Sequence, residues 1–303
     1  MKDTQNGHNL AIYHFLETQL QLFKGHFLIT QASMDEEAIH QMRVAIKRIR
    51  TIQKLKKHIN FPTIIDEEQY KTIKTIFADS GRLRDLQIQQ SLLNNYSKKL
   101  KFSYSELSGH LKNRETELTN RLNKTISNTD FSRFLEIPEP AESMDDLDDK
   151  TDLENESLDF LKKKIDNIRK LIFTLDQDKY VHDLRKQVKQ LFFILQFLKN
   201  HFPKSLVSGH SLKTLKVVGE KIGDWNDRDV FLVMLNAYIA EKPEDYLLEN
   251  AEYRILQYVL TEEKRKFLEG IDVDLYLELM KITAILDSAK AEDENVEAEG
   301  SLT

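Results

Sequence analysis

Apolar residues recur along most of the chain at the three- and four-residue spacing of an amphipathic α-helix. The clearest example begins at Ile39, where Met42, Ala45, Ile46, Ile49 and Ile52 share one side of the helical wheel. The opposite side holds, within an arc of about 80°, the basic residues His40, Arg43, Lys47, Arg50 and Lys54. We find no convincing alternation of period two, the pattern typical of strands. The chain is therefore predicted to be all-α.

Helices are expected in both halves of the chain. In the first half they cover about 8–29, 64–79, 83–98 and 104–126. A further helix, which carries His40, is expected to begin after Asp35 as its N-cap. The second half repeats this order over about 158–175, 205–221, 226–240, 245–267 and 274–290. The helix that carries His182 is expected to have Asp178 as its N-cap. Gly81 and Gly223 are expected to end helices, because glycine accepts positive φ. Each half is predicted to be an up-down bundle of four or more helices.

Four blocks of sequence recur at a constant separation of 142 positions. His40, Arg43 and Lys47 correspond to His182, Arg185 and Lys189. The other three pairs are KTIK at 71–74 with KTLK at 213–216, GRLRD at 81–85 with GDWND at 223–227, and LNNY at 93–96 with LNAY at 235–238. The turns Phe61-Pro62 and Phe202-Pro203 follow with a slip of one residue. Blocks in one order and one register indicate an internal duplication.

The net charge of −6 hides an uneven distribution of charge. Residues 136–159 hold eleven acidic residues and one lysine, and residues 291–303 hold five acidic residues and no base. Outside these two segments, lysine and arginine outnumber the acids by 43 to 34. Acid-rich segments with little apolar surface are typically disordered. We therefore expect an N-terminal bundle over 1–137, an acidic linker over 138–157, a C-terminal bundle over 158–290 and an acidic tail over 291–303.

Composition narrows the class of protein further. Nine glycines and five prolines in 303 residues favour long helices with few turns. The absence of cysteine excludes disulfides, thiolate metal sites and a cysteine nucleophile. No apolar run approaches the roughly 18 residues of a transmembrane helix, and the N-terminus has no basic-then-apolar leader. A soluble cytoplasmic protein is expected.

The repeated basic stripe points to an anionic ligand. The segment 43–58 contains no acidic residue, whereas an ordinary solvent-exposed helix mixes both signs. Lys71 and Lys74 lie one turn apart, and Lys213 and Lys216 repeat this arrangement. Stacked cations repel one another, so their presence in both copies suggests that an anion lies between them. Guanidinium and ammonium groups are the usual ligands of phosphate oxygens.

The motifs H-x-x-R-V-x-x-K-R-x-R from His40 and G-x-x-R-D-x-x-I from Gly81, with their second copies from His182 and Gly223, resemble the CHAD domain, the conserved histidine α-helical domain. The resemblance extends over about 9–290. It implies two helical bundles related by a pseudo-twofold axis, with basic helices lining a central groove. It also implies binding of inorganic polyphosphate and association with polyphosphate granules. An E-x-E-x-K strand, the mark of the triphosphate-processing domain that adjoins many members, is absent from the sequence.

The resemblance matches the basic residues of the two repeated helices most directly. It matches the lysines of the following helices more loosely. The full set of candidate polyphosphate-binding residues is His40, Arg43, Lys47, Arg48, Arg50, Lys54, Lys71, Lys74, Arg84, His182, Arg185, Lys186, Lys189, Lys213 and Lys216. Gln190 and Phe192 stand where further bases are expected, so the second copy is expected to contribute less charge. No catalytic residue, metal ligand or cofactor is expected.

Other functions remain open at this point. A nucleic-acid binder would use the same phosphate contacts, but the first basic stripe carries no aromatic ring for base stacking. A helical scaffold for another protein would use the acidic linker instead. A metal-dependent phosphohydrolase is disfavoured, because the His182-Asp183 pair has Gln41 in place of the aspartate in the first copy.

Four residues of the repeated blocks could have a structural role instead of a role in binding or catalysis. His40 and His182 either contact the ligand or pack within the fold. Asp85 and Asp227 are expected to cap helices or to position neighbouring bases, rather than to act as catalytic acids. Trp225, the single tryptophan of the chain, is expected in the core.

Overall fold

The structure, a computed structural model, describes residues 2–58, 65–134, 153–175, 177–201, 209–243, 245–246 and 250–300. These residues form helices and no strand, which confirms the all-α prediction. The turns Phe61-Pro62 and Phe202-Pro203 and most of the expected acidic linker lie outside this part of the chain.

The helices divide between the two halves of the chain. The first half comprises α1 (Lys2–Ser33), α2 (Glu36–His58), α3 (Glu67–Leu100), α4 (Ser105–Ser127) and the 3₁₀ turn η1 (Phe131–Phe134). The second half comprises α5 (Leu153–Ile172), α6 (Asp178–His201), α7 (Gly209–Ala240), α9 (Ala251–Leu268) and α10 (Ile271–Gly300). The repeated His-x-x-Arg-x-x-x-Lys blocks fall on α2 and α6, and the other repeated blocks fall on α3 and α7. Each block and its copy therefore occupy helices of the same order in the two halves.

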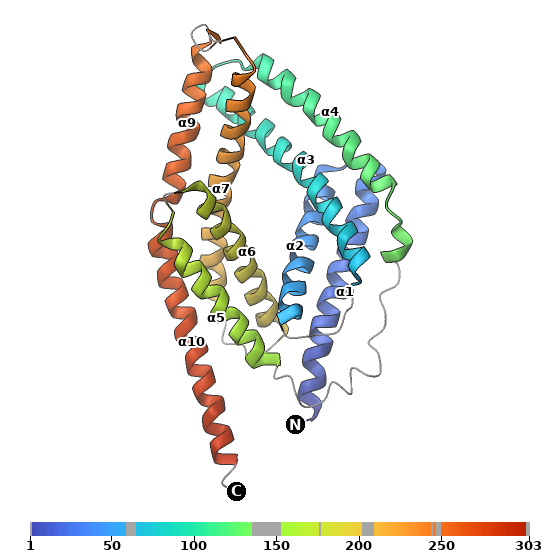
Figure 1. The fold of residues 1–303 in the computed structure, drawn as a ribbon, viewed down its shortest axis with the longest axis vertical. Coiled ribbons are helices and arrows are strands. Elements are labelled where there is room, and N and C mark those ends of the chain that lie inside the picture. The colour runs from blue at the N-terminus through green and yellow to red at the C-terminus, as the bar shows by residue number, and fades with distance from the viewer. Residues whose placement is uncertain are drawn as a thin grey trace.

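The two halves face each other across the middle of the molecule. In Figure 1, α1 and α2 run side by side in one half, and α5 and α6 do so in the other. α2 contacts α6, and α3 contacts α7. The long helices α3 and α7, with their partners α4 and α9, extend to the upper end of the molecule, where the halves meet again. The halves therefore touch both at the repeated basic helices and at the far ends of the longest helices.

Two helix ends predicted at glycine residues are wrong. α3 runs without interruption through Gly81, and α7 runs through Gly223. Among the described residues, positive φ occurs at Met34, Lys101 and Gly270 only. The helices continue because their apolar stripes pack on both sides of each glycine, and this burial offsets the roughly 1 kcal/mol cost of a glycine inside a helix.

Of the two predicted helix caps, Asp35 is confirmed and Asp178 is not. The Asp35 carboxylate accepts a hydrogen bond from the Ala38 backbone N–H at 2.7 Å, which confirms it as the cap of α2. Asp178 is the first residue of α6 rather than its cap, and its carboxylate binds Lys264 Nζ at 2.6 Å. α5 begins inside the expected linker, and α10 continues to Gly300 through most of the expected acidic tail. Alanine and glutamate in that tail are strong helix formers, so charge alone does not prevent a helix there.

One hydrophobic core runs through both halves. It joins buried residues of α1, α2 and α3 with those of α5, α6, α7 and α10, and it includes the fully buried Trp225, as predicted. A second cluster joins α3 and α4 to α7 and α9 at the upper end of the molecule. The apolar faces of α2 and α6 are buried in the first of these clusters, and this burial fixes the positions of the two basic helices.

The repeated LNNY and LNAY blocks contribute tyrosines to this second cluster. The Tyr96 hydroxyl of α3 donates to Glu263 Oε2 of α9 at 2.5 Å, and Lys99 Nζ binds Glu263 Oε1 at 2.6 Å. The Tyr238 hydroxyl of α7 lies 3.4 Å from Glu106 Oε2 of α4. Each repeated tyrosine thus contacts a glutamate of the opposite half, far from the basic helices.

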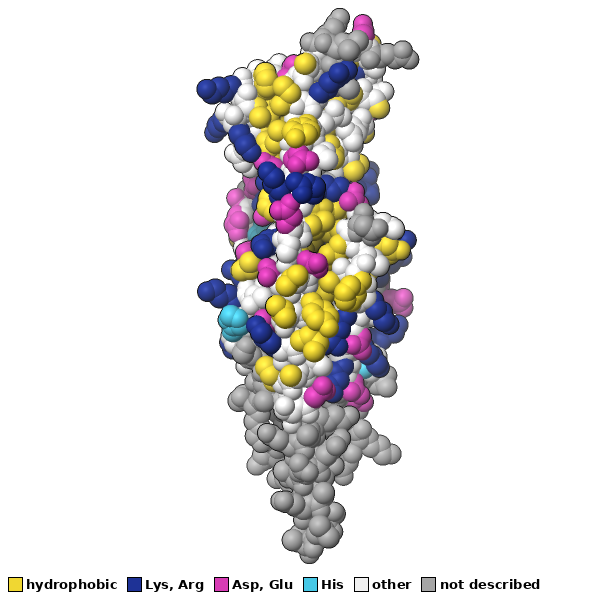
Figure 2. Space-filling view, turned by 90° about the vertical axis from the view of Figure 1, so that its left-hand side faces the viewer, with side chains coloured by type: hydrophobic (Ala, Val, Ile, Leu, Met, Phe, Trp, Pro, Cys, Tyr) yellow, Lys and Arg dark blue, Asp and Glu magenta, His cyan; other side chains and the backbone are white. Residues whose placement is uncertain are grey.

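Exposed apolar side chains gather along α10 and just after the end of α5. Phe173 is 76% exposed, and its ring contacts Tyr276 edge to face. Figure 2 shows a face of the molecule on which apolar side chains are bordered by charges of both signs. In the part of the chain that the structure describes, no helix has the length and apolarity that a membrane span requires.

Candidate functional site

Six charged residues from both halves meet where α2 faces α6. Arg43 and Lys47 come from α2, and Arg185 and Lys189 come from α6. Asp85 of α3 interacts electrostatically with Arg43, Lys47 and Arg185, and Asp227 of α7 with Arg185 and Lys189. We call this group the central charge cluster. Its members form three pairs in the 142-residue register, and its cations outnumber its anions by two to one.

Burial shifts the acid–base properties of the central charge cluster. Burial, together with the neighbouring Lys189, lowers the pKa of Lys47 to about 7. Burial and Arg185 lower the pKa of Lys189 to about 8, and burial lowers the pKa of Arg43 to about 10. Burial raises the pKa values of Asp85 and Asp227 despite the adjacent arginines. The cations are therefore held close together at an electrostatic cost that an anionic ligand would remove.

Arg43 is fixed by contacts within the first half. Its Nη1 donates to the Phe77 carbonyl oxygen at 2.6 Å and lies 3.2 Å from Ser80 Oγ. Its guanidinium also lies over the Phe77 ring, 4.4 Å from the centroid. Asp85 favours the charged form of the guanidinium. Asp85 lies inside α3, so the alternative that it caps a helix is wrong.

Arg185 has different surroundings although it is the counterpart of Arg43. Gly219 replaces Phe77 at the equivalent position of α7, and Ile222 replaces Ser80. The second copy therefore has neither the aromatic ring nor the hydroxyl that hold Arg43. The Nε of Arg185 is buried without a hydrogen-bond partner among the described residues. Asp227 favours the charged form of Arg185 and lies inside α7, so it too is not a helix cap.

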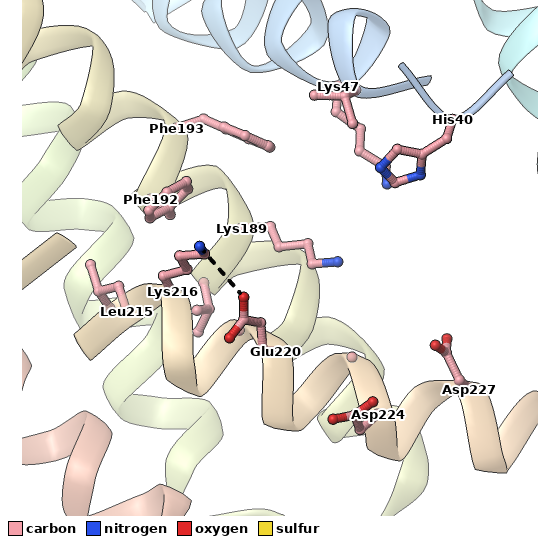
Figure 3. A pocket seen from close by; sticks show the side chains of 14 residues that line it. His40, Lys47, Lys189, Phe192, Phe193, Leu215, Lys216, Glu220, Asp224 and Asp227 are labelled. Carbon is pink, nitrogen blue, oxygen red and sulfur yellow. Dashed lines mark ion pairs between the residues drawn. The ribbon is translucent and has the colours of Figure 1, made fainter. Parts of the chain in front are cut away.

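A pocket of about 490 Å³ opens beside the central charge cluster. In Figure 3, His40 and Lys47 of α2 face Lys189, Phe192 and Phe193 of α6 across the pocket. The α7 wall carries Lys216 and three carboxylates, and Lys216 Nζ lies 3.8 Å from Glu220 Oε1. The remaining lining residues are Val44, Val188, Leu215, Gly219, Gly223, Asp224 and Asp227. The pocket therefore combines cations, an apolar wall and hydrogen-bond acceptors.

A second basic group lies farther along α2. The ammonium of Lys54 interacts with Arg50, with Lys186 of α6 and with Lys164 of α5. Lys164 Nζ donates to Gln187 Oε1 and Gln190 Oε1, both at 3.0 Å. Sequence analysis missed Lys164, because α5 has no counterpart among the repeated blocks. Its position after an apolar turn of α5 carries no signal that it would face the basic helices.

The other candidates lie in different places. Arg48 Nη1 is 3.4 Å from Gln19 Oε1 of α1, so its guanidinium points toward α1 rather than to Arg43. Arg84 pairs with Glu36 at the start of α2. Lys71, Lys74 and Lys213 are exposed on α3 and α7, and the ammonium of Lys74 lies over the Tyr70 ring. The structure thus brings Arg43, Lys47, Arg185 and Lys189 together, and it leaves these other cations outside the central charge cluster.

The two histidines have unequal surroundings. His182 Nε2 lies 2.9 Å from Asp229 Oδ2, and its Nδ1 lies 3.2 Å from Asn226 Oδ1. Both nitrogens of His182 are therefore engaged by α7, and its ring packs against Trp225. His40 lines the pocket, and burial together with Arg84 lowers its pKa. His182 is thus held by α7, whereas His40 lines the pocket.

No group of three or more His, Asp or Glu side chains with the proximity needed to hold a metal ion occurs among the described residues. The carboxylates nearest the pocket are each engaged by a neighbour: Asp224 by Arg228 at 3.3 Å, and Asp227 by Asn226 Nδ2 at 3.3 Å.

Comparison with known proteins agrees with this architecture. A family model described as the CHAD domain matches residues 14–236, which is more than half of the chain. The crystal structure of the CHAD domain from the plant Ricinus communis superimposes with a TM-score of 0.65 at 17% sequence identity, covering 88% of this chain and 91% of that chain. No curated protein matches the chain significantly by sequence.

Proposed function

The chain belongs to the CHAD domain family, and we propose that it binds inorganic polyphosphate through the central charge cluster. The observation that carries this proposal is the burial of Arg43, Lys47, Arg185 and Lys189 beside the carboxylates of Asp85 and Asp227. A partly desolvated excess of cations is costly without an anion, and phosphate oxygens are suited to guanidinium and ammonium groups. The resemblance of the repeated motifs to a family associated with polyphosphate supports the same ligand.

The contribution of both halves favours a chain of phosphates over a single phosphate. Arg43 and Lys47 come from one repeat, and Arg185 and Lys189 come from the other. The second basic group at Lys54, Lys164 and Lys186 continues the cationic surface along the same helices. An extended polyanion contacts both groups at once, whereas orthophosphate contacts only one.

We propose a binding role without turnover, with polyphosphate granules as the place where the protein acts. The test of the first part is incubation of pure protein with long-chain polyphosphate and divalent metals, with no release of phosphate expected. Metal-dependent release that is lost in a His182→Ala variant would contradict it. Colocalisation of the tagged protein with stained granules tests the second part.

The decisive experiment for the ligand is competition among long-chain polyphosphate, RNA and DNA over a series of salt concentrations. Polyphosphate is expected to bind most tightly, with an affinity that falls steeply as salt rises because bound counterions are released. Orthophosphate is expected to compete weakly. If RNA or DNA displaces polyphosphate at equal phosphate concentration and equal salt, the protein is a nucleic-acid binder instead.

A further inference from the structure

The first repeat contains a filled aromatic site that the second repeat leaves open. The ring of Phe77 lies between two guanidinium groups, with the carbon of Arg43 at 4.4 Å and that of Arg50 at 4.8 Å from its centroid. At the corresponding position of the second repeat stands Gly219, which lines the pocket of about 490 Å³. The pocket is thus found where the duplication has lost an aromatic side chain.

The walls of this pocket suit a planar ring. Phe192 takes the place of Arg50, and it lies beside Phe193 with the two rings edge to face at 5.6 Å. Glycine at 219 leaves the α7 wall flat, and a Cβ added there would meet only Val188 Cγ1, at 4.0 Å. Aromatic and apolar walls of this kind bind flat heterocycles by stacking and burial. The size of the pocket falls within the range of small-molecule sites, about 300–1,000 Å³.

The polar groups of the pocket are separated into two kinds. His40 and Lys47 come from α2 and Lys189 from α6, whereas Asp224 and Asp227 lie along α7 with Lys216 and Glu220 (Figure 3). A carboxylate accepts several hydrogen bonds, so Asp224 and Asp227 can each accept another one besides that from the neighbouring side chain. Carboxylates repel phosphate, but they accept hydrogen bonds from the amino group of a nucleobase. A bare phosphate chain therefore satisfies only one side of the pocket.

We propose that this pocket binds the base of a nucleoside polyphosphate, with adenine, guanine or cytosine over Gly219 and the phosphates on Lys47 and Lys189. The phosphate end of this proposal rests on the same cations as the proposed function. The base end rests independently on the replacement of Phe77 by Gly219 and on the carboxylates of α7.

The test compares ligands that share a triphosphate and differ in the base or in the whole nucleoside. Calorimetric titrations without divalent metals would use ATP, UTP and tripolyphosphate, which has the phosphates of ATP without the nucleoside. ATP is expected to bind about tenfold more tightly than tripolyphosphate, as base stacking predicts. UTP, whose base has no amino group, is expected to bind less tightly than ATP. Equal affinities for ATP and tripolyphosphate would overturn the proposal, and this comparison requires no variant.

A matched pair of variants locates the base. Gly219→Phe restores the ring that the first repeat has, and it should reduce the affinity for ATP to that for tripolyphosphate. It should leave tripolyphosphate and long-chain polyphosphate within about twofold of the parent protein, because the cations are unchanged. Gly219→Ala, which adds only a methyl group, should retain the preference for ATP, and far-UV circular dichroism would verify that both variants are folded.

The outcomes separate this inference from the proposed function. Loss of ATP binding in Gly219→Phe in a protein that does not bind long-chain polyphosphate would support the base site and refute polyphosphate binding. Tight binding of polyphosphate with no preference for ATP over tripolyphosphate would support polyphosphate binding and refute the base site. An equal loss of ATP and tripolyphosphate in Gly219→Phe would contradict the base site.

Discussion

The guanidinium of Arg43 occupies the space that a side chain at Gly81 would need. A Cβ at residue 81 would lie 2.8 Å from Arg43 Nη1 and 3.2 Å from Nη2. Glycine stands at this point of α3 because a basic side chain of α2 packs flat against the helix, and not because the chain turns there. The equivalent Gly223 has no atom within 4 Å of such a Cβ. The same glycine in the two repeats therefore has different physical roles.

The two glycines should respond differently to alanine. Gly81→Ala should displace the Arg43 guanidinium from the Phe77 carbonyl oxygen and weaken binding of long-chain polyphosphate about threefold, because a charge-assisted contact is disturbed. Gly223→Ala should leave that affinity unchanged and stabilise the fold by about 0.5–1 kcal/mol through helix propensity. Urea denaturation and polyphosphate titration measure the two effects. Identical behaviour of the two variants would show that the Arg43–Gly81 contact has no consequence.

Arg43 and Arg185 should separate stability from binding. Arg185→Gln should lower affinity for polyphosphate about tenfold and reduce the salt dependence by about one phosphate contact, with little change in stability. Arg43→Gln should lower affinity similarly and also destabilise the fold by about 1–2 kcal/mol, because its bond to the Phe77 carbonyl oxygen is lost. Arg114→Gln, on the exposed face of α4, is the matched control and should change neither quantity. Binding by Arg185→Gln equal to that of the parent would exclude the second repeat from the site.

Affinity for polyphosphate should fall as pH rises from 7 to 9. In the free protein the pKa of Lys47 is about 7 and that of Lys189 about 8, so both ammonium groups lose protons across this range. A bound polyanion favours the protonated forms, and binding above pH 7 must therefore take up protons at a cost in affinity. Titrations at constant ionic strength in two buffers of different ionisation enthalpy would measure the proton uptake. Lys47→Arg should flatten the pH dependence, because arginine stays protonated.

The same pKa shift predicts a pH dependence of stability in the free protein. The folded-state pKa of Lys47 lies below its ordinary value of 10.5, so the unfolded chain binds more protons between pH 7 and pH 10. Unfolding is therefore favoured toward the lower end of this window, and the contribution of Lys47 to stability should rise as pH increases. Thermal midpoints at pH 7 and pH 9 should show a smaller increase in Lys47→Met than in the parent. An equal increase in both proteins would place the titration elsewhere.

The tyrosine contacts between the halves should contribute to stability without affecting the ligand. Tyr96→Phe removes the 2.5 Å hydrogen bond to Glu263 and should cost about 1 kcal/mol of unfolding free energy. Tyr238→Phe should cost less, because its contact with Glu106 is 3.4 Å long and Tyr246 shares the same carboxylate. Tyr258→Phe, 67% exposed, serves as the control. A change in polyphosphate affinity in Tyr96→Phe would indicate that the upper contact controls the geometry of the central charge cluster.

The sequence by itself determined the all-α class, the duplication and the basic face of the two repeated helices. Helical periodicity is a local property of the chain, and a repeat is visible in the residues alone. Family membership followed from the same repeated blocks. These features required no knowledge of which helices contact one another.

Tertiary structure decided which of the repeated residues act alike. α3 and α7 pass through their glycines because packing on both sides holds the helix, and no local signal reports that packing. His182 is engaged by Asn226 and Asp229, whereas His40 faces Arg84 and the pocket, because the residues that differ between the repeats lie on neighbouring helices. Lys164 joins the basic surface from a helix outside the repeated blocks. The pocket itself arises from the absence of a ring at Gly219, and an absence becomes a cavity only when the surrounding helices hold their positions.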